Sequence, residues 1–180
     1  MRERALVDAA LTAAAAWAIA SGGTGVASRR ECRTTPGHGP GGGVGRADGL
    51  VVWRDDDAAL LVAVVEAKSP ALLLATVPRP SLQRPGVTVP ALEQLRAYPG
   101  NAHILCCHDQ TLDADPLVRQ VLQACCERDG VGLLAVNWYG ETSWRVAPVL
   151  RPTPWLWTDC LDGYAAGPKL RAARPTQATS

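Results

Sequence analysis

The chain has 180 residues, of which 47% are apolar and 19% are charged. These values fit one globular domain and exclude a disordered or collagen-like chain. The 18 Lys and Arg residues nearly balance the 17 Asp and Glu residues, which gives a formal net charge of +1. The molecule as a whole therefore carries no large basic field, and any contact with nucleic acid would have to come from a local patch.

The N-terminal segment is rich in alanine up to Ala20 and predicts a helix that Gly22-Gly23 ends. Its larger apolar residues and several alanines share one helical face: Leu6, Val7, Ala10, Leu11, Ala13, Ala14 and Trp17. The basic start, Met1-Arg2-Glu3-Arg4, followed by an apolar run, also matches a secretory signal. A packed helix and a cleaved signal are therefore both open.

The six cysteines favour a protein kept in a reducing compartment. None forms the C-x-x-C spacing of a zinc site, and the neighbours Cys106-Cys107 and Cys125-Cys126 make poor local disulfides. We therefore expect reduced, mostly buried thiols and a cytoplasmic location. Beyond the first helix no apolar run is long enough to cross a membrane, so we expect no membrane partner. The secreted alternative would require paired thiols.

A glycine-rich loop over residues 36–45 leads into a predicted β-hairpin. Its strands are the apolar runs 50–53 and 60–65, and the second run is apolar on both faces, which predicts a central, covered strand. Further along the chain we expect a helix over 90–98, a strand over 103–107, a second helix, a strand over 131–136 and a pairing segment at 144–146. The second helix runs from Pro116 to about Gly130 and is capped by Asp115. Its inward-facing residues are expected to be Leu117, Val118, Val121, Leu122 and Cys125.

The order of these elements predicts an α/β domain whose mixed sheet is flanked by helices. We assign this domain to residues 1–147. Residues 148–180 are expected to form a Pro-rich extension with Trp155 and Trp157 as docking anchors and a disordered end. The Pro-rich stretch 70–90 is expected to be an excursion from the core.

Two carboxylates are predicted to meet at one end of the hairpin. Folding the hairpin about its acidic turn places Asp48, at the foot of the first strand, opposite the neighbourhood of Glu66. Strand alternation places Lys68 on the same face as Glu66 and turns Ala67 to the other. Unpartnered buried charges are costly, so two acids and an amine on an apolar scaffold favour a bound cation or an anionic ligand.

The segments Gly45-Arg46-Ala47-Asp48-Gly49 and Val64-Val65-Glu66-Ala67-Lys68 together resemble the PD-(D/E)xK signature of restriction-endonuclease-like nucleases. Gln94-Leu95-Arg96-Ala97-Tyr98 is similar to the Q-x-x-x-Y helix motif of RecB-like members, and an opening helix also fits that family. The resemblance spans residues 1–146. It implies a restriction-endonuclease-like mixed sheet and a magnesium-dependent nuclease, with DNA as the expected substrate.

The resemblance also implies a role for each matching position. Asp48, Glu66 and the main-chain carbonyl of Ala67 would bind Mg²⁺, for which Mn²⁺ could substitute. Lys68 would orient the attacking water or offset charge developing on phosphorus. Four side chains would form the catalytic set: Asp48, Glu66, Lys68 and Gln94. Four would contact substrate, with Glu3 on the first helix as a further candidate for the site: Arg46, Arg79, Arg84 and Tyr98.

Other interpretations remain open from the sequence. Asp48 could be a turn residue, and Glu66 with Lys68 a solvated strand end. A nuclease-like fold could also serve as a nucleic-acid- or protein-binding module without turnover, which the near-zero net charge favours slightly. In either case a second copy of the chain or a larger complex could contribute to nucleic-acid binding. Zinc binding by His103, the neighbouring cysteines and His108 is disfavoured, because a strand splays alternate side chains to both faces.

Overall fold

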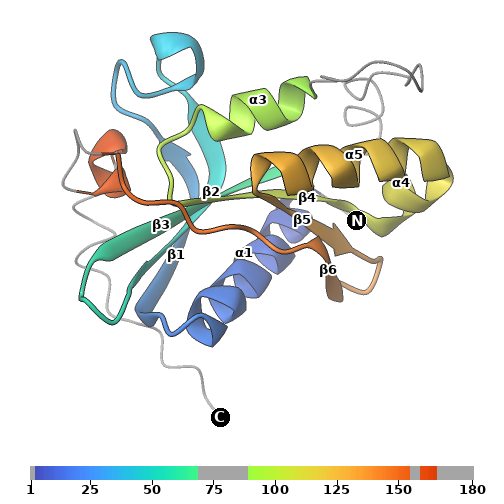
Figure 1. The fold of residues 1–180 in the computed structure, drawn as a ribbon, viewed down its shortest axis with the longest axis horizontal. Helices are drawn as coiled ribbons and strands as arrows, with labels where there is room; N and C mark the ends of the chain where they lie inside the picture. Colours follow the sequence, from blue (N-terminus) through green and yellow to red (C-terminus); the bar gives the residue numbers. More distant parts are fainter. Residues whose placement is uncertain (1–2, 69–88, 155–158, 166–180) are drawn as a thin grey trace.

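The computed structural model describes residues 3–68, 89–154 and 159–165, and its centre is a six-stranded mixed sheet (Figure 1). Strand order in the sheet follows chain order: β1 (Thr24–Arg33), β2 (Arg46–Arg54), β3 (Leu60–Lys68), β4 (Ala102–His108), β5 (Val131–Val136) and β6 (Thr142–Val146). The pairs β3–β4 and β4–β5 are parallel, and the other three pairs are antiparallel. This arrangement confirms the predicted α/β fold with a mixed sheet packed against helices.

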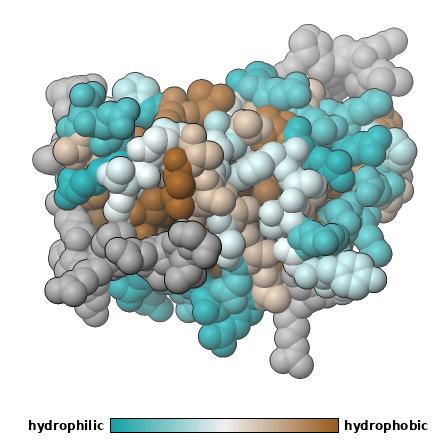
Figure 2. All heavy atoms as spheres, turned by 90° about the horizontal axis from the view of Figure 1, so that it is seen from below, coloured by the Kyte–Doolittle hydropathy of each residue, from teal (hydrophilic) through white to brown (hydrophobic). Residues whose placement is uncertain are grey.

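Helices cover both faces of the sheet. Figure 1 shows α1 (Glu3–Ala20) beneath it, and α3 (Pro90–Arg96), α4 (Asp109–Ala114) and α5 (Pro116–Asp129) above it. Each face has its own apolar core, one built on α1 and the other on α3 and α5. Seen from the α1 side, apolar atoms gather around the centre of the face, and hydrophilic atoms lie around them, with the largest group at the right (Figure 2).

The predicted first helix is confirmed as part of the core. Its buried residues repeat every three or four positions, as expected for one face packed on the sheet: Leu6, Val7, Ala10, Leu11, Ala13, Ala14 and Ala18. Trp17 is only half-buried and packs edge-to-face on Trp53 of β2, with ring centroids 5.7 Å apart. Gly49 gives α1 room to approach, because a Cβ there would lie 2.7 Å from the Leu11 side chain.

The predicted hairpin is also confirmed. Gly49 lies opposite Val65 and Leu50 opposite Val64, which is the register that folding about the acidic turn requires. In β3 every residue from Val62 to Ala67 is buried, as expected for a central strand. α3, β4, β5 and β6 form close to their expected bounds, and α5 is capped by Asp115, whose side chain accepts from the N–H groups of Leu117 and Val118.

Two elements were not predicted. The edge strand β1 forms where the sequence is mostly polar, and it pairs with β2 along its length, with a bulge after Thr24. The short helix α4 follows β4 directly. One prediction within α5 was wrong: Leu117 lies in the first turn on the outer side and is 37% exposed instead of facing inward. The glycine-rich loop contains a single 3₁₀ turn, η1 (Pro40–Gly42).

The chain beyond residue 147 also contributes to the core. The 3₁₀ turn η2 (Cys160–Gly163) buries Cys160 and Leu161, and Tyr164 donates a hydrogen bond to the Pro99 carbonyl at 2.8 Å. Trp155, Trp157 and the expected disordered end lie outside the described residues. Among the helices that the structure describes, none is both long and apolar enough to span a membrane.

Candidate functional site

The charged residues singled out in the sequence meet where β2 begins and β3 ends. Because these two strands are antiparallel neighbours, the start of one and the end of the other share one edge of the sheet. Asp48 lies in the third position of β2, and Glu66 and Lys68 lie in the last three positions of β3. The structure therefore brings together the two acids and the amine, as predicted.

Asp48 is half-buried and bonds directly to the β3 backbone. Its Oδ2 accepts a hydrogen bond from the main-chain N–H of Ala67 at 2.8 Å. The ladder between β2 and β3 ends at the pair Gly49 and Val65, one residue short of Asp48 in β2 and two residues short of Ala67 in β3. The carboxylate thus takes the N–H that the β2 backbone would have bound had the ladder continued. This contact fixes the position of Asp48 beside Glu66.

Glu66 is a buried carboxylate, with 4% of the residue exposed. Its Oε1 lies 2.5 Å from Lys68 Nζ, whereas its Oε2 is buried with no hydrogen-bond partner among the described residues. Burial and then the charge of Asp48 raise the pKa of Glu66, whereas the hydrogen bond and charge of Lys68 and a hydrogen bond from the Asp48 main chain lower it in part. A buried oxygen without a partner is costly, so this atom is suited to a ligand.

Lys68 is the cation of the cluster. Its side chain is 12% exposed and it pairs with Glu66, two residues earlier on the same face of β3. The side chain of Ala67 between them is buried in the core on the α1 side. Alternation along one strand is therefore what places the amine next to the acid, as the sequence predicted.

Tyr98 and Gln94 lie at the end of α3, over the same face of the sheet. The Tyr98 hydroxyl donates to the Arg46 carbonyl at 3.0 Å and also hydrogen-bonds to the Gln94 side chain. Burial and then the charge of Glu66 raise the pKa of Tyr98, whereas its two hydrogen bonds act in the opposite direction. Tyr98, for which the resemblance implied a substrate contact, is thus buried near the cluster, and it ties α3 to the start of β2. Gln94 is exposed.

The remaining predicted residues divide into two groups. Arg46 is exposed at the first position of β2, two residues before Asp48. Arg79 and Arg84 lie outside the described residues. Glu3 begins α1, but its side chain also falls outside what the structure describes.

The donor set at this edge suits a hard divalent cation. Asp48 and the unpartnered Glu66 Oε2 are carboxylate oxygens, and Mg²⁺ is usually bound by one or two carboxylates together with waters and substrate oxygens. Within the described part of the chain, no three His, Cys, Asp or Glu side chains group as metal ligands, and the resemblance implies the Ala67 carbonyl as the third protein ligand. Of the residues considered for zinc, His103 is buried and its Nε2 lies 2.9 Å from the Tyr98 carbonyl.

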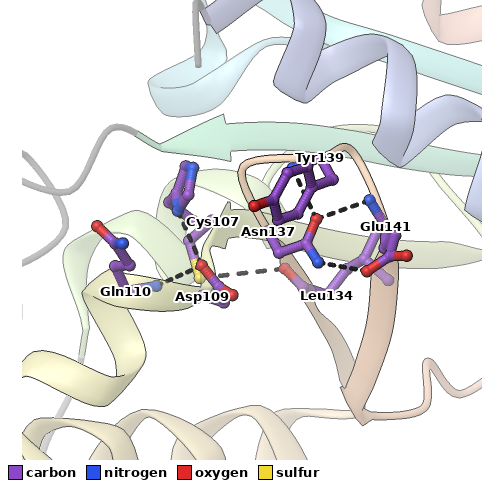
Figure 3. A network of polar contacts seen from close by, with 8 residues as sticks. Cys107, Asp109, Gln110, Leu134, Asn137, Tyr139 and Glu141 are labelled. Atoms are coloured by element: carbon purple, nitrogen blue, oxygen red, sulfur yellow. Dashed lines mark hydrogen bonds and ion pairs between the residues drawn. The ribbon is translucent and has the colours of Figure 1, made fainter.

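One neighbouring group was not predicted to matter. His108, the last residue of β4, is 5% exposed; its Nδ1 lies 3.0 Å from Asp109 Oδ1 and its Nε2 is buried without a hydrogen-bond partner among the described residues. Figure 3 shows the adjoining network, in which Asp109 faces Gln110 and Asn137 faces Glu141. The sequence offers no local signal for this arrangement, because it depends on how β5 continues into its turn.

Comparison with known proteins adds no relative. No family model matches the chain, and no curated protein matches it either. The resemblance to PD-(D/E)xK nucleases therefore rests on the residues named above and on the way the sheet brings them together.

Proposed function

We propose that the chain is a metal-dependent nuclease of the restriction-endonuclease-like type, which hydrolyses phosphodiester bonds, with DNA as its substrate. The observation that supports this most is the buried Glu66 Oε2, which has no partner in the described structure and lies in a cluster with the Asp48 carboxylate and the Lys68 ammonium. Two acids and a lysine that meet where β2 begins and β3 ends are suited to metal-assisted attack on a phosphodiester.

In this proposal Asp48, Glu66 and the Ala67 carbonyl hold Mg²⁺ or Mn²⁺. The ion, when bound, supplies Lewis-acid polarisation of the phosphodiester and a more acidic water. The hydrogen bond from Ala67 N–H keeps Asp48 aimed at the cluster. Lys68 carries a positive charge beside Glu66, where it orients the attacking water or offsets the negative charge that develops on phosphorus. Tyr98 holds the start of β2, and with it Asp48, through the Arg46 carbonyl.

The test is cleavage of a panel of linear, nicked, branched and single-stranded DNA, and of RNA, with Mg²⁺ or Mn²⁺. We expect Glu66→Ala and Lys68→Ala to lower the cleavage rate by about 100-fold or more, in line with the loss of one preorganised charge at a reacting centre. Asp56→Ala is the matched control, because Asp56 is an exposed acid in the turn at the opposite end of the hairpin. Circular dichroism on each variant checks that it is folded.

Cleavage that persists in folded Glu66→Ala, or that falls equally in Asp56→Ala, would contradict the assignment of this site. Cleavage of only one class in the panel would identify the substrate. Sedimentation of the protein with and without that substrate would show whether a second copy of the chain takes part.

One observation favours a second candidate function, a nuclease-like fold that binds without turnover. Lys68 already pairs with Glu66 at 2.5 Å, and within the described residues no third acid joins the two carboxylates. A folded protein that binds DNA or RNA but cleaves nothing in the panel, with either metal, would support this candidate over the first. Stabilisation by Mg²⁺ alone would not separate the two, because a protein without turnover can still bind the ion.

A further inference from the structure

All six strands of the sheet end or begin along the edge that carries the candidate site. Parallel pairing sets Lys68 at the end of β3 beside Cys107, and His108 beside Val136 at the end of β5. Antiparallel pairing brings the start of β2 and the end of β1 to the same edge. The order across this edge is therefore β1, β2, β3, β4, β5 and β6, and the Asp48–Glu66–Lys68 cluster lies at β2 and β3.

The β1 end of the edge is basic. Arg33 and Arg46 are direct cross-strand partners, and both are exposed. Like charges directly opposite each other on two strands repel and destabilise the pairing. Neither side chain forms an ion pair with any residue that the structure describes. Two adjacent guanidinium groups without an acid between them suit an anion such as a phosphate.

The β5 end of the edge is aromatic. The turn after Val136 presents Trp138, which is 56% exposed, and Tyr139, which is 91% exposed. The Trp138 ring packs on the buried His108 ring, with centroids 4.2 Å apart. Asn137 holds the turn, because its Oδ1 accepts from the N–H groups of Tyr139 and Glu141.

The acids near the aromatic turn are already engaged within the protein. Glu141 accepts a hydrogen bond from Asn137 Nδ2 at 2.6 Å, and Asp109 contacts His108 and the N–H of Gln110 (Figure 3). Both carboxylates therefore already accept hydrogen bonds that stabilise the turn and the start of α4. The turn presents two aromatic rings on a prearranged backbone, which lowers the entropy lost when a planar group stacks on them.

We propose that a single strand of nucleic acid lies across this edge, with its phosphates on Arg33 and Arg46 and its bases stacked on Trp138 and Tyr139. The proposal rests on the proposed function, because it places the bond to be cut between these two ends. Four strand spacings separate β1 from β5, roughly 19 Å at about 4.8 Å each, which equals about five to six phosphate steps at roughly 3.4 Å each along a stacked strand. Aromatic stacking selects single strands, since bases within a duplex have no free face.

The test is binding of end-labelled oligothymidylate to the full chain in EDTA, where hydrolysis cannot interfere. We expect Arg33→Ala with Arg46→Ala to weaken binding about tenfold and to reduce the salt dependence by about one charge per arginine. Arg54→Ala is the matched control, because Arg54 is an exposed arginine at the opposite end of β2. Tyr139→Ala should weaken binding about fivefold or more without unfolding, since Tyr139 is 91% exposed. Trp138→Leu tests the second ring while keeping an apolar side chain against His108.

A second arm replaces the bases by abasic sites. Binding of this strand should be weaker in the native protein and should no longer respond to Tyr139→Ala, whereas it should still respond to the arginine pair. Oligomers shorter than about five nucleotides should bind less tightly than longer ones. Equal binding of duplex and single strand would overturn the single-strand assignment, and native affinity in the arginine or the aromatic variants would overturn the path itself. A Tyr139→Ala variant whose self-association changes while its DNA binding stays intact would also overturn the path.

These outcomes can be told apart from failure of the proposed function. Binding that depends on both ends of the edge, in a protein that cleaves nothing with Mg²⁺ or Mn²⁺, would support the path and contradict the nuclease. Cleavage that depends on Glu66 and Lys68 but is unaffected by all four edge substitutions would support the nuclease and contradict the path.

Discussion

Asp48 hydrogen-bonds to the backbone of Ala67 through its side chain, at the point where β2 and β3 separate. The contact spans 19 residues along the chain and joins the first acid of the site to the residue next to the second. One carboxylate therefore both ends the ladder and contributes charge to the cluster. Its structural and chemical roles can be separated by substitution.

Asp48→Asn keeps an oxygen that can accept from Ala67 N–H, whereas Asp48→Ala does not. We expect Asp48→Ala to be less stable than Asp48→Asn by about 1–3 kcal/mol, because it leaves the N–H of a buried residue unpaired. Both variants should lose cleavage and Mg²⁺-dependent stabilisation, because both lose the charge. Urea unfolding with and without Mg²⁺ measures both effects. Full stabilisation of Asp48→Asn by Mg²⁺ would show that the charge is not needed for the ion.

Glu66→Gln should change how stability depends on pH. Burial and the Asp48 charge raise the pKa of Glu66 above its ordinary value of 4.5, so the folded state favours the protonated form. The stability gained from that form is complete below pH 4.5 and is lost as the pH rises through the raised value. Gln resembles the protonated acid at every pH, and its amide oxygen can still accept from Lys68.

We therefore expect Glu66→Gln to unfold at higher urea concentration than the native protein at pH 7, with the difference closing below pH 4.5. Glu127→Gln, an exposed glutamate on α5, is the matched control and should show no such pH-dependent gain. A Glu66→Gln variant that is less stable than the native protein at pH 7 would mean that the ion pair with Lys68 outweighs the burial of charge.

Tyr98→Phe should affect activity more than an equivalent change elsewhere. It removes the hydroxyl that donates to the Arg46 carbonyl and so loosens the start of β2, which carries Asp48. Tyr164→Phe is the comparison, because that buried hydroxyl also donates to a main-chain carbonyl, but to that of Pro99, after α3, and not to one in β2. Each change should cost about 1 kcal/mol of unfolding free energy. The cleavage rate should fall only in Tyr98→Phe, and equal rates in the two variants would argue against a positioning role.

The thiols should be unreactive in the folded protein. None of the six cysteines forms a disulfide in the described structure and all six are buried, and burial raises the pKa of Cys32 and Cys160 to about 11 and that of Cys107 to about 12. The reactive thiolate is therefore scarce at pH 8. A thiol reagent should label the native protein slowly and should label six cysteines after unfolding in urea. Fewer than six under non-reducing conditions would indicate disulfides and favour the secreted alternative.

Local signals account for most of what the sequence predicted correctly. Counting residues outward from the turn at 54–57 gives the hairpin register, and this register places Asp48 near Glu66. Alternation within one strand places Glu66 and Lys68 together, and the Asp115-Pro116 start and Gly130 end delimit α5. None of these inferences needed contacts between distant parts of the chain.

What the sequence missed depends on such contacts. The polar strand β1 has no apolar periodicity, and its Glu31 adopts a positive φ of 52° that a strand pattern does not anticipate. It is a strand because β2 offers it a free edge. The bond from Asp48 to Ala67 depends on where two strands diverge, and the buried Nε2 of His108 depends on packing by the turn after β5.

The strands lie in the sheet in the same order as along the chain, and this order determines where the chain can accept insertions or deletions. Glu66 of β3 lies beside Leu105 of β4, so residues 69–101 connect two strands that are already neighbours. The entropy of closing such a connection rises only slowly with its length. Insertions or deletions within 69–88 should therefore leave the Asp48–Glu66 pair in register, which makes this connection a suitable place to graft a new specificity segment in place of Arg79 and Arg84.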